Sequence, residues 1–322
     1  MAITFILLIV GLVLILVGAD ALVNGASDVA RKYGISEFVV GLTIVGIGTS
    51  APELVVSALS AIQGSSDIAI GNVVGSNISN VFLILGITTL ITPVILTKTN
   101  LKYDLPIALG VSVLLFFLAY DTLFFGGEKN IISRWDGLIL IVGFAIFMIY
   151  SFATASDDQF SESEQDENKE RVKMGKAIIQ IILGLAGLII GGRLFVNSGS
   201  SIAKSLGVSD AFIGITVMAV GTSLPELAAS INAALKKKSQ MALGNVIGSN
   251  IFNILLILGV SSVIRPLTLG DITFVDMAMM ISTTVLIILG ALAICRREIK
   301  RWQGLIFVLI YIAYIIYLAI NI

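Results

Sequence analysis

Two six-residue stretches, GTSAPE at 48–53 and GTSLPE at 221–226, place hydroxyls, a proline and a carboxylate together inside strongly apolar sequence. Proline has no N–H, so Pro52 and Pro225 each leave the carbonyl four residues earlier without its helical hydrogen bond. Each stretch therefore predicts a break in a helix. The half-helix that ends at the break presents carbonyl oxygens with partial negative charge, which suits a cation.

The composition identifies the surroundings of these stretches as a lipid bilayer. The chain has 322 residues, 57% of them hydrophobic and 13% charged, and a mean hydropathy of +1.02. Soluble proteins are about 45–50% apolar and about 25% charged, so we expect an integral membrane protein. A net charge of -1 gives no field for nucleic acid, and the lack of histidine excludes Ser–His and Cys–His catalysis.

Glu53 and Glu226 come directly after the two prolines. A carboxylate in the bilayer core costs about 2.5–3.5 kcal/mol on insertion scales, so it requires a partner or a function. Arg193, the basic residue placed deepest in a predicted helix, cannot neutralise both glutamates. Two protonated, hydrogen-bonded glutamic acids are one interpretation. The interpretation that we favour is a site where carboxylates, hydroxyls and freed carbonyls bind a cation, an all-oxygen ligand set that suits Ca²⁺ and that Na⁺ also tolerates.

A second shared block follows each break: GNVVGSN at 71–77 with Asn80 after it, and GNVIGSN at 244–250 with Asn253 after it. Residues four apart share a helix face, so the serine of each block can present its hydroxyl beside the amide oxygen of the following asparagine. Hydrogen bonding between helices is the alternative role for these side chains, and the glycines four apart predict close helix packing.

Ten membrane-spanning helices are predicted, near residues 3–30, 37–63, 67–92, 104–120, 135–154, 176–205, 210–235, 240–264, 272–295 and 302–320. With the N-terminus outside, the cytoplasmic loops hold 15 basic residues against 4 on the opposite side, so the positive-inside rule places both termini outside the cytoplasm. The acidic stretch 156–173 is typical of a solvated linker.

The sequence contains an internal duplication. Residues 41–86 and 214–259, which are 173 positions apart, agree at 24 of 46 positions without a gap. Because each half holds five helices, an odd number, the second copy enters the membrane upside down, which is a recurrent architecture of secondary transporters. We therefore predict an all-α polytopic membrane protein with two inverted five-helix repeats, 1–155 and 174–322, joined by the linker 156–173, and with the second and seventh helices broken at mid-membrane.

The same shift places Asp20 opposite Arg193. Opposite charges at equivalent positions are compatible with an ion pair between the first and sixth helices. They are equally compatible with two side chains that extend separately to the membrane surface.

With these motifs, the sequence resembles the cation/calcium exchanger superfamily, and within it the prokaryotic sodium/calcium exchanger (antiporter) type. The motif pairs GTSAPE…GNVVGSNISN and GTSLPE…GNVIGSNIFN carry the resemblance, which extends over nearly the whole chain. It implies that the first and sixth helices slide as a gating unit across the other helices. Other members carry aspartate at the position of Asn253, which is associated with potassium coupling, so asparagine here argues against a K⁺ requirement.

The resemblance also implies an ion site. Its members would be the acidic ligands Glu53 and Glu226, the surrounding hydroxyls of Thr49, Thr222, Ser50 and Ser223, the carbonyls of Gly46 and Ala219, the flanking Na⁺ ligands Ser76 and Ser249, and Asn80 and Asn253 at the centre.

The predicted function is secondary active transport, not enzymatic catalysis: Na⁺ exchanges for Ca²⁺ by alternating access, and Ca²⁺ is extruded electrogenically. Two ionised glutamates are neutralised by one Ca²⁺, whereas three Na⁺, the family's usual count, leave a charge of +1. Ca²⁺/H⁺ exchange is the nearest alternative, and a cation channel is a more distant one. We expect Ca²⁺ and Na⁺ as transported ions, no cofactor, the lipid bilayer of the cell (plasma) membrane as the environment, and no nucleic-acid partner; the sequence is compatible with a monomer.

Overall fold

The computed structural model of the chain describes residues 2–124, 126, 129–153, 173–205, 221–292 and 297–321. The predicted linker 156–173, apart from Lys173, and the first half of the predicted seventh helix, including Ala219, lie outside these residues.

In the first half of the chain the elements are α1 (Ala2–Tyr33), α2 (Glu37–Val40), the π-helical turn η1 (Gly41–Val45), α3 (Gly46–Thr49), α4 (Ala51–Gln63), α5 (Ser66–Ser79), η2 (Asn80–Leu85), α6 (Gly86–Ile91), β1 (Val94–Ile95), η3 (Asn100–Asp104), α7 (Leu105–Ala119), α8 (Asp121–Phe124), β2 (Ile131–Ile132) and α9 (Arg134–Ala153). In the second half they are α11 (Met174–Ser205), α14 (Leu224–Leu235), α15 (Ser239–Phe252), η6 (Asn253–Leu258), α16 (Gly259–Ile264), β3 (Leu267–Thr268), α17 (Phe274–Leu292), β4 (Glu298–Ile299) and α18 (Arg301–Asn321).

The predicted all-helical membrane fold is confirmed. Within the described residues, eight helices are long and apolar enough to cross a bilayer, and the bent pair Glu37–Thr49 and Ala51–Gln63 supplies a ninth span. Of the predicted seventh helix, the described part is Gly221 onward, with α14 as its second half. The π-helical turns continue their neighbouring α-helices, so α5, η2 and α6 form one span, as do α15, η6 and α16.

Two small β-sheets connect the halves of the chain, and the sequence analysis did not predict them. β1 pairs antiparallel with β4, with Val94 opposite Ile299, and β2 pairs antiparallel with β3, with Ile131 opposite Thr268. Each strand has two residues, which is too short for an alternating pattern to be recognised in sequence. Because each sheet takes one strand from each half, the halves are hydrogen-bonded to each other beside the ends of their helices.

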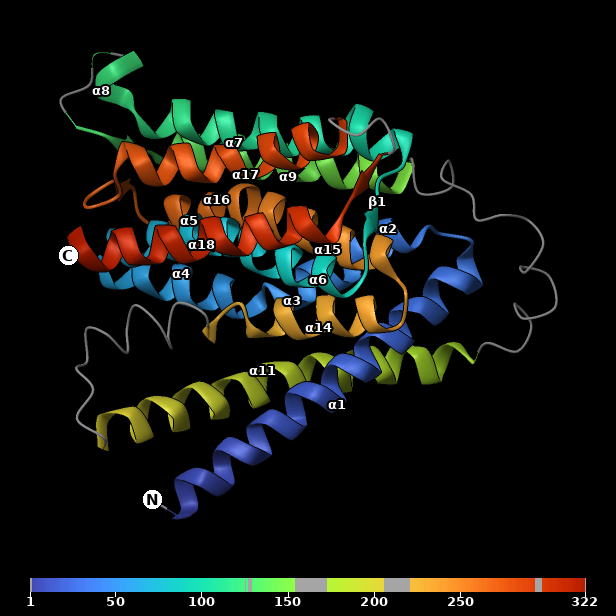
Figure 1. Ribbon diagram of the computed structural model, residues 1–322. Coiled ribbons are helices and arrows are strands. Elements are labelled where there is room, and N and C mark those ends of the chain that lie inside the picture. Colours follow the sequence, from blue (N-terminus) through green and yellow to red (C-terminus); the bar gives the residue numbers. More distant parts are fainter. Residues whose placement is uncertain are drawn as a thin grey trace.

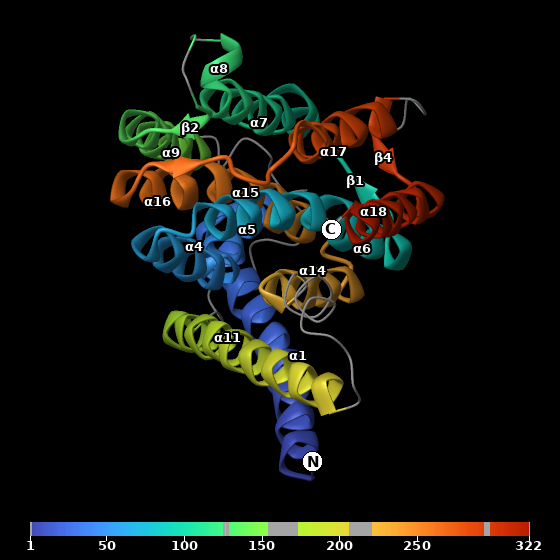
Figure 2. The ribbon, with the colours of Figure 1, turned by 90° about the vertical axis from the view of Figure 1, so that its left-hand side faces the viewer.

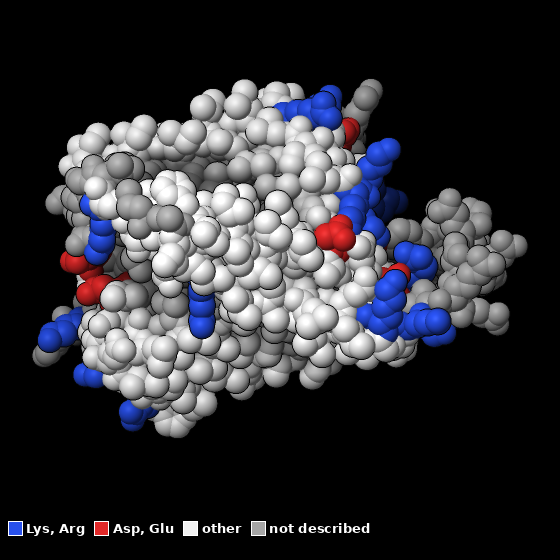
Figure 3. Space-filling model, turned by 90° about the horizontal axis from the view of Figure 1, so that it is seen from below, with Lys and Arg blue, Asp and Glu red and all other residues white. Residues whose placement is uncertain are grey.

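Helices α1 and α11 cross each other on one side of the remaining bundle (Figures 1 and 2). Glycines let their backbones approach closely: a Cβ placed on Gly18 would lie 2.8 Å from the carbonyl oxygen of Gly184. Space-filling representation shows Lys and Arg gathered toward the two ends of the molecule, with a largely uncharged belt between them (Figure 3). This distribution is the one expected of a protein that crosses a bilayer.

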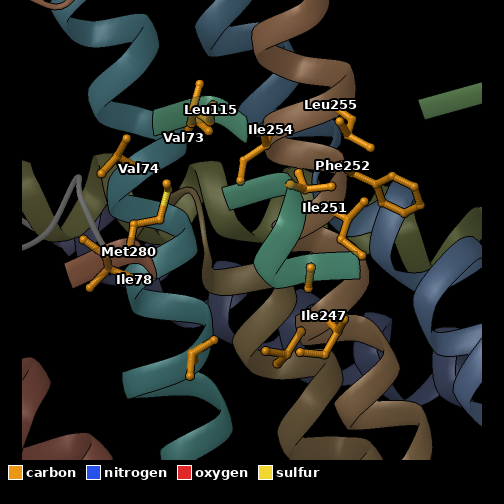
Figure 4. Packing of buried hydrophobic residues seen from close by; sticks show 14 of the residues in the cluster. Val73, Val74, Ile78, Leu115, Ile247, Ile251, Phe252, Ile254, Leu255 and Met280 are labelled. Atoms are coloured by element: carbon orange, nitrogen blue, oxygen red, sulfur yellow. The ribbon is translucent and has the colours of Figure 1, made fainter. Parts of the chain in front are cut away.

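The main hydrophobic core surrounds the spans that contain α5 and α15. Side chains such as Val73, Ile78, Ile247 and Ile251 point into the space between these and the neighbouring helices (Figure 4). All four are at most 1% exposed. This packing keeps α5 and α15 side by side at the centre of the molecule, where their polar residues can meet.

Of the two interpretations given for Asp20 and Arg193, the structure excludes the ion pair between them. Asp20 pairs with Lys236, at 2.6 Å, and the Lys236 ammonium also donates to Asn24 Oδ1 at 2.6 Å. Arg193 lies on an exposed face of α11. Lys236 follows the last residue of α14, a helix that packs on α1, and it therefore reaches Asp20 from a neighbour that the repeat alignment did not identify.

The predicted close packing is confirmed at Gly244 and Gly248, the glycines of the shared block in the second half of the chain. A Cβ on Gly244 would lie 2.1 Å from the Phe38 carbonyl oxygen, and one on Gly248 would lie 2.3 Å from that of Leu42. At Gly75, the equivalent of Gly248, a Cβ would meet no described atom within 4 Å. Thus α15 packs backbone to backbone against α2 and η1, the segment that leads into the first break.

We predict that Gly244→Ala destabilises the protein by about 1–3 kcal/mol, because the new methyl group must push two backbones apart. Thermal unfolding in detergent measures this as a lower midpoint. Gly110→Ala is the matched control: it lies within α7 and a Cβ there meets no described atom within 4 Å, so the midpoint should hold or rise slightly. Equal midpoints for the two variants would contradict the close approach.

Candidate cation-binding site

The predicted break in the second helix is present, and the same backbone geometry recurs in the second half of the chain. Helix α3 ends at Thr49 and α4 begins at Ala51, with a bend of 45° between the two sides. Ser50, between them, has φ -81° and ψ 5°, and Ser223, directly before α14, has φ -85° and ψ 7°. The proline after each serine occupies the first turn of the resumed helix, where its missing N–H is tolerated.

Glu53 and Glu226 occupy the first turns of α4 and α14, and each is only 1% exposed. The N-terminal end of a helix carries partial positive charge, which stabilises a carboxylate at this position. Helix α3, which ends directly before the first break, packs against α14, so the two breaks lie next to each other. Two acidic side chains, one from each half of the chain, therefore meet in a buried region.

Hydroxyl groups cross between the halves beside these acids. The Ser50 hydroxyl donates to Glu226 Oε1 at 3.0 Å and lies 3.0 Å from the Ser249 hydroxyl. In the reciprocal position, the Ser223 hydroxyl lies 3.4 Å from that of Ser76. The serine of each break thus contacts the conserved block of the opposite half, as inverted symmetry requires.

Two asparagines that the sequence analysis did not assign, Asn72 and Asn245, support the breaks. The Asn245 amide nitrogen donates to the Glu226 carbonyl at 3.3 Å and to Ser230 Oγ at 2.9 Å, while its oxygen is 3.2 Å from the Thr49 hydroxyl. Asn72 repeats the arrangement with the Glu53 carbonyl at 3.2 Å, Ser57 Oγ at 2.9 Å and the Thr222 hydroxyl at 3.5 Å. Asn72 and Asn245 are identical residues at equivalent positions of the two repeats, 173 residues apart, and this match could have identified them from the sequence.

Four buried oxygen atoms in this region accept no hydrogen bond from any described residue: Glu53 Oε2, Glu226 Oε2, Asn80 Oδ1 and Asn253 Oδ1. A buried oxygen without a partner is costly. All four belong to residues that the sequence analysis assigned to the ion site, and all four can donate electron pairs to a hard cation. The arrangement therefore suits a cation with oxygen ligands.

The remaining predicted residues lie around this centre, with one exception. Gly46 packs against α15, since a Cβ on it would lie 3.3 Å from the Ser249 nitrogen, and its carbonyl accepts a bond from the Ser50 N–H at 3.1 Å. Ala219 lies outside the described residues. Asn80 and Asn253 begin the π-helical turns η2 and η6, a departure from α-helix that is frequent at functional sites and that the sequence analysis missed.

Comparison with known proteins gives a consistent family match. The family described as "Sodium/calcium exchanger protein" matches residues 3–153 and again 176–320. The chain is 36% identical over 349 residues to the sodium/calcium exchanger MaX1 of Methanosarcina acetivorans, covering 98% of both proteins. It is also 36% identical over 266 residues to the inner membrane protein YrbG of Escherichia coli, covering 81% of this chain and 79% of that protein.

Solved structures of the sodium-calcium exchanger NCX_Mj are similar over the full fold. One of them, from a crystal soaked with Na⁺, has a TM-score of 0.81 and 34% identity and covers 98% of this chain and 99% of that one. Another, soaked with Na⁺ and Sr²⁺, has a TM-score of 0.82 and 34% identity, with 97% of each chain covered.

We predict that Asn72→Ala and Asn245→Ala each destabilise the protein by about 1–3 kcal/mol, because each leaves a buried glutamate carbonyl without its donor. Thermal unfolding in detergent provides the measurement, and the repeat symmetry predicts similar losses for both variants. Ser112→Ala is the control, since that buried hydroxyl bonds only the Ala108 carbonyl of its own helix among the described residues and should change the midpoint less. Midpoints of both asparagine variants equal to wild type would show that these amides do not support the breaks.

Proposed function

The chain belongs to the sodium/calcium exchanger protein family, and we propose that it exchanges Na⁺ for Ca²⁺ across the membrane by alternating access. The single observation that carries this proposal is that Glu53, Glu226, Asn80 and Asn253 each have a buried oxygen that accepts no hydrogen bond from the described residues. Two relatives support the choice of ions: MaX1 is named a sodium/calcium exchanger, and the sodium-calcium exchanger NCX_Mj was crystallised and soaked with Na⁺ and Sr²⁺.

The charge of the site explains why the two ions would compete. With both glutamates ionised the empty site carries a formal charge of -2, which one Ca²⁺ neutralises and which three Na⁺ convert to +1. Because both loads would use the same oxygens, they exclude each other. An unloaded, doubly charged site would also resist passage through an apolar barrier because of its desolvation cost, and this restriction couples the two fluxes.

The ligands would be the two glutamates with the surrounding hydroxyls and asparagine oxygens. In this proposal Thr49, Ser50, Thr222 and Ser223 line the centre, Ser76 and Ser249 serve flanking Na⁺ sites, and the carbonyls of Gly46 and Ala219 complete the set. Of these, Ser50 and Ser249 already lie within 3.0 Å of each other across the two halves.

Helices α1 and α11 are the proposed gating unit. They pack closely on each other at glycines such as Gly18 and Gly184, and they lie to one side of the bundle (Figure 2). This arrangement supports the proposal that they slide as a pair. The repeats are assigned to 1–155 and 174–322, with 156–173 as a cytoplasmic linker. The proposed location is the cell membrane, with both termini on the extracytoplasmic side, at the end opposite β1 and β4 (Figure 1).

Glu53→Gln and Glu226→Gln are each expected to lower Na⁺-driven ⁴⁵Ca²⁺ uptake into Na⁺-loaded proteoliposomes by at least about 100-fold, since loss of one charged ligand removes about 3 kcal/mol of binding. Glutamine keeps the shape of glutamate and removes its charge. Glu37→Gln is the matched control: Glu37 pairs with Lys238 at 2.5 Å at the first residue of the broken span, away from the break itself, so uptake should be retained. Full uptake by either site variant would refute the assignment.

Exchange of three Na⁺ for one Ca²⁺ moves one net charge, worth about 2.3 kcal/mol per 100 mV. When Na⁺ leaves the vesicles and Ca²⁺ enters, positive charge moves outward, so an inside-positive potential set by K⁺ and valinomycin should accelerate uptake and an inside-negative potential should slow it. Protein-free liposomes are the control. Ca²⁺ flux that ignores both the Na⁺ gradient and the voltage would contradict the proposal, and uptake driven by a pH jump without Na⁺ would instead identify Ca²⁺/H⁺ exchange.

A further inference from the structure

Four buried asparagines form a hydrogen-bonded network between the two halves of the chain, with Asn77 and Asn250 bonded to each other at its centre. Asn77 and Asn80 come from the span of α5 and η2, and Asn250 and Asn253 come from the span of α15 and η6. Each is at most 6% exposed. Asn77 and Asn250 are equivalent under the repeat, and so are Asn80 and Asn253.

Two backbone carbonyls set the orientation of the amides at the centre of this network. Asn77 Nδ2 donates to the Asn250 carbonyl at 3.2 Å, and Asn250 Nδ2 donates to the Asn77 carbonyl at 3.3 Å. A carbonyl can only accept, so the NH₂ group of each side chain must face the opposite backbone. The Oδ1 atoms of Asn77 and Asn250 are therefore directed toward the other two asparagines.

Those two oxygens determine how Asn80 and Asn253 are oriented. Asn80 Nδ2 donates to Asn250 Oδ1 at 3.0 Å, and Asn253 Nδ2 donates to Asn77 Oδ1 at 2.9 Å. Reversing either amide would bring two acceptors together and lose the bond. The amide oxygens that the network does not use are Oδ1 of Asn80 and Oδ1 of Asn253, which accept no hydrogen bond from the described part of the chain.

We propose that Asn77 and Asn250 are positioning residues that hold the amide oxygens of Asn80 and Asn253 toward the transported cation; this inference rests on the proposed function. Without the bonds to Asn250 and Asn77, the amides of Asn80 and Asn253 could rotate and present N–H donors to the ion, which a cation repels. Residues that orient metal ligands in this way typically change metal affinity by about 10–100-fold when they are removed.

The alternative is a purely structural role, in which Asn77 and Asn250 only join two helices. Both roles predict a loss of stability on mutation, because buried partners lose hydrogen bonds. Only the positioning role predicts a specific loss of Ca²⁺ affinity that exceeds the loss caused by deleting an equally buried amide elsewhere. Asn100 supplies that comparison: it is 0% exposed, and its amide bonds Asp104 and the Thr97 backbone.

The experiment compares Asn77→Leu, Asn250→Leu and Asn100→Leu, since leucine has a similar shape to asparagine and makes no hydrogen bond. Two quantities are measured on the full chain: the half-saturating Ca²⁺ concentration for Na⁺-driven uptake in proteoliposomes, and the rise in unfolding midpoint caused by Ca²⁺ in detergent. Asn77→Leu and Asn250→Leu should raise the half-saturating concentration by about tenfold or more, with a smaller change in maximal rate. Asn100→Leu should lower the midpoint and leave the half-saturating concentration unchanged.

Asn77→Asp tests rescue, because a carboxyl group keeps an acceptor for Asn253 whether ionised or protonated; it should stay closer to wild-type affinity than Asn77→Leu. If the leucine variants do not fold, Asn77→Ser and Asn250→Ser take their place, since a hydroxyl is too short to bond both partners. Wild-type Ca²⁺ affinity in folded Asn77 and Asn250 variants would overturn the inference, and so would an equal loss of Ca²⁺ affinity in Asn100→Leu. Failure of the proposed function is distinguishable, since the wild type itself would then show neither Na⁺-driven uptake nor stabilisation by Ca²⁺.

Discussion

The burial of two carboxylates inside a membrane protein is the constraint on which the rest of this structure depends. Glu53 and Glu226 are each 1% exposed, and one oxygen of each accepts no hydrogen bond from the described residues. Such groups are expensive in a bilayer and are tolerated where they have a function. The broken helices offset part of this cost, because each acid occupies the first turn of a resumed helix, where the helix dipole favours negative charge.

Inverted duplication supplies the rest of the surroundings. The side chains of one break alone would bring one acid and two hydroxyls, which are fewer oxygens than the roughly 6–8 that Ca²⁺ takes. Because the second copy enters from the opposite side, Ser50 reaches Glu226, and the hydroxyls of Thr49 and Thr222 meet Asn245 and Asn72. Glycine-mediated packing of α15 on η1, and the two inter-repeat sheets, keep these groups in register.

The motifs predicted much of this arrangement because proline and glycine act locally. Pro52 removes a backbone donor wherever it stands, so the break at Ser50 could be predicted without any knowledge of the fold. The alignment of the two halves of the sequence predicted the inverted symmetry of the fold. Partners set by three-dimensional packing could not be predicted in the same way: Lys236 reaches Asp20 from a helix that only the fold brings near, and the strands β1 to β4 are two residues long. The direction of the amide of Asn253 likewise depends on the side chain of Asn77, which is far away in sequence.

The central claim is that the two acids share a metal ion. The most direct measurement is the anomalous scattering of Ca²⁺ or Sr²⁺ in a crystal of this protein soaked with that ion and without Na⁺. A single strong peak should lie between Glu53 and Glu226, about 2.3–2.6 Å from an oxygen of each if the ion is Ca²⁺, and it should fade as Na⁺ is added. A well-ordered crystal with no peak there, or with the two side chains hydrogen-bonded to each other around an empty centre at saturating Ca²⁺, would contradict the account.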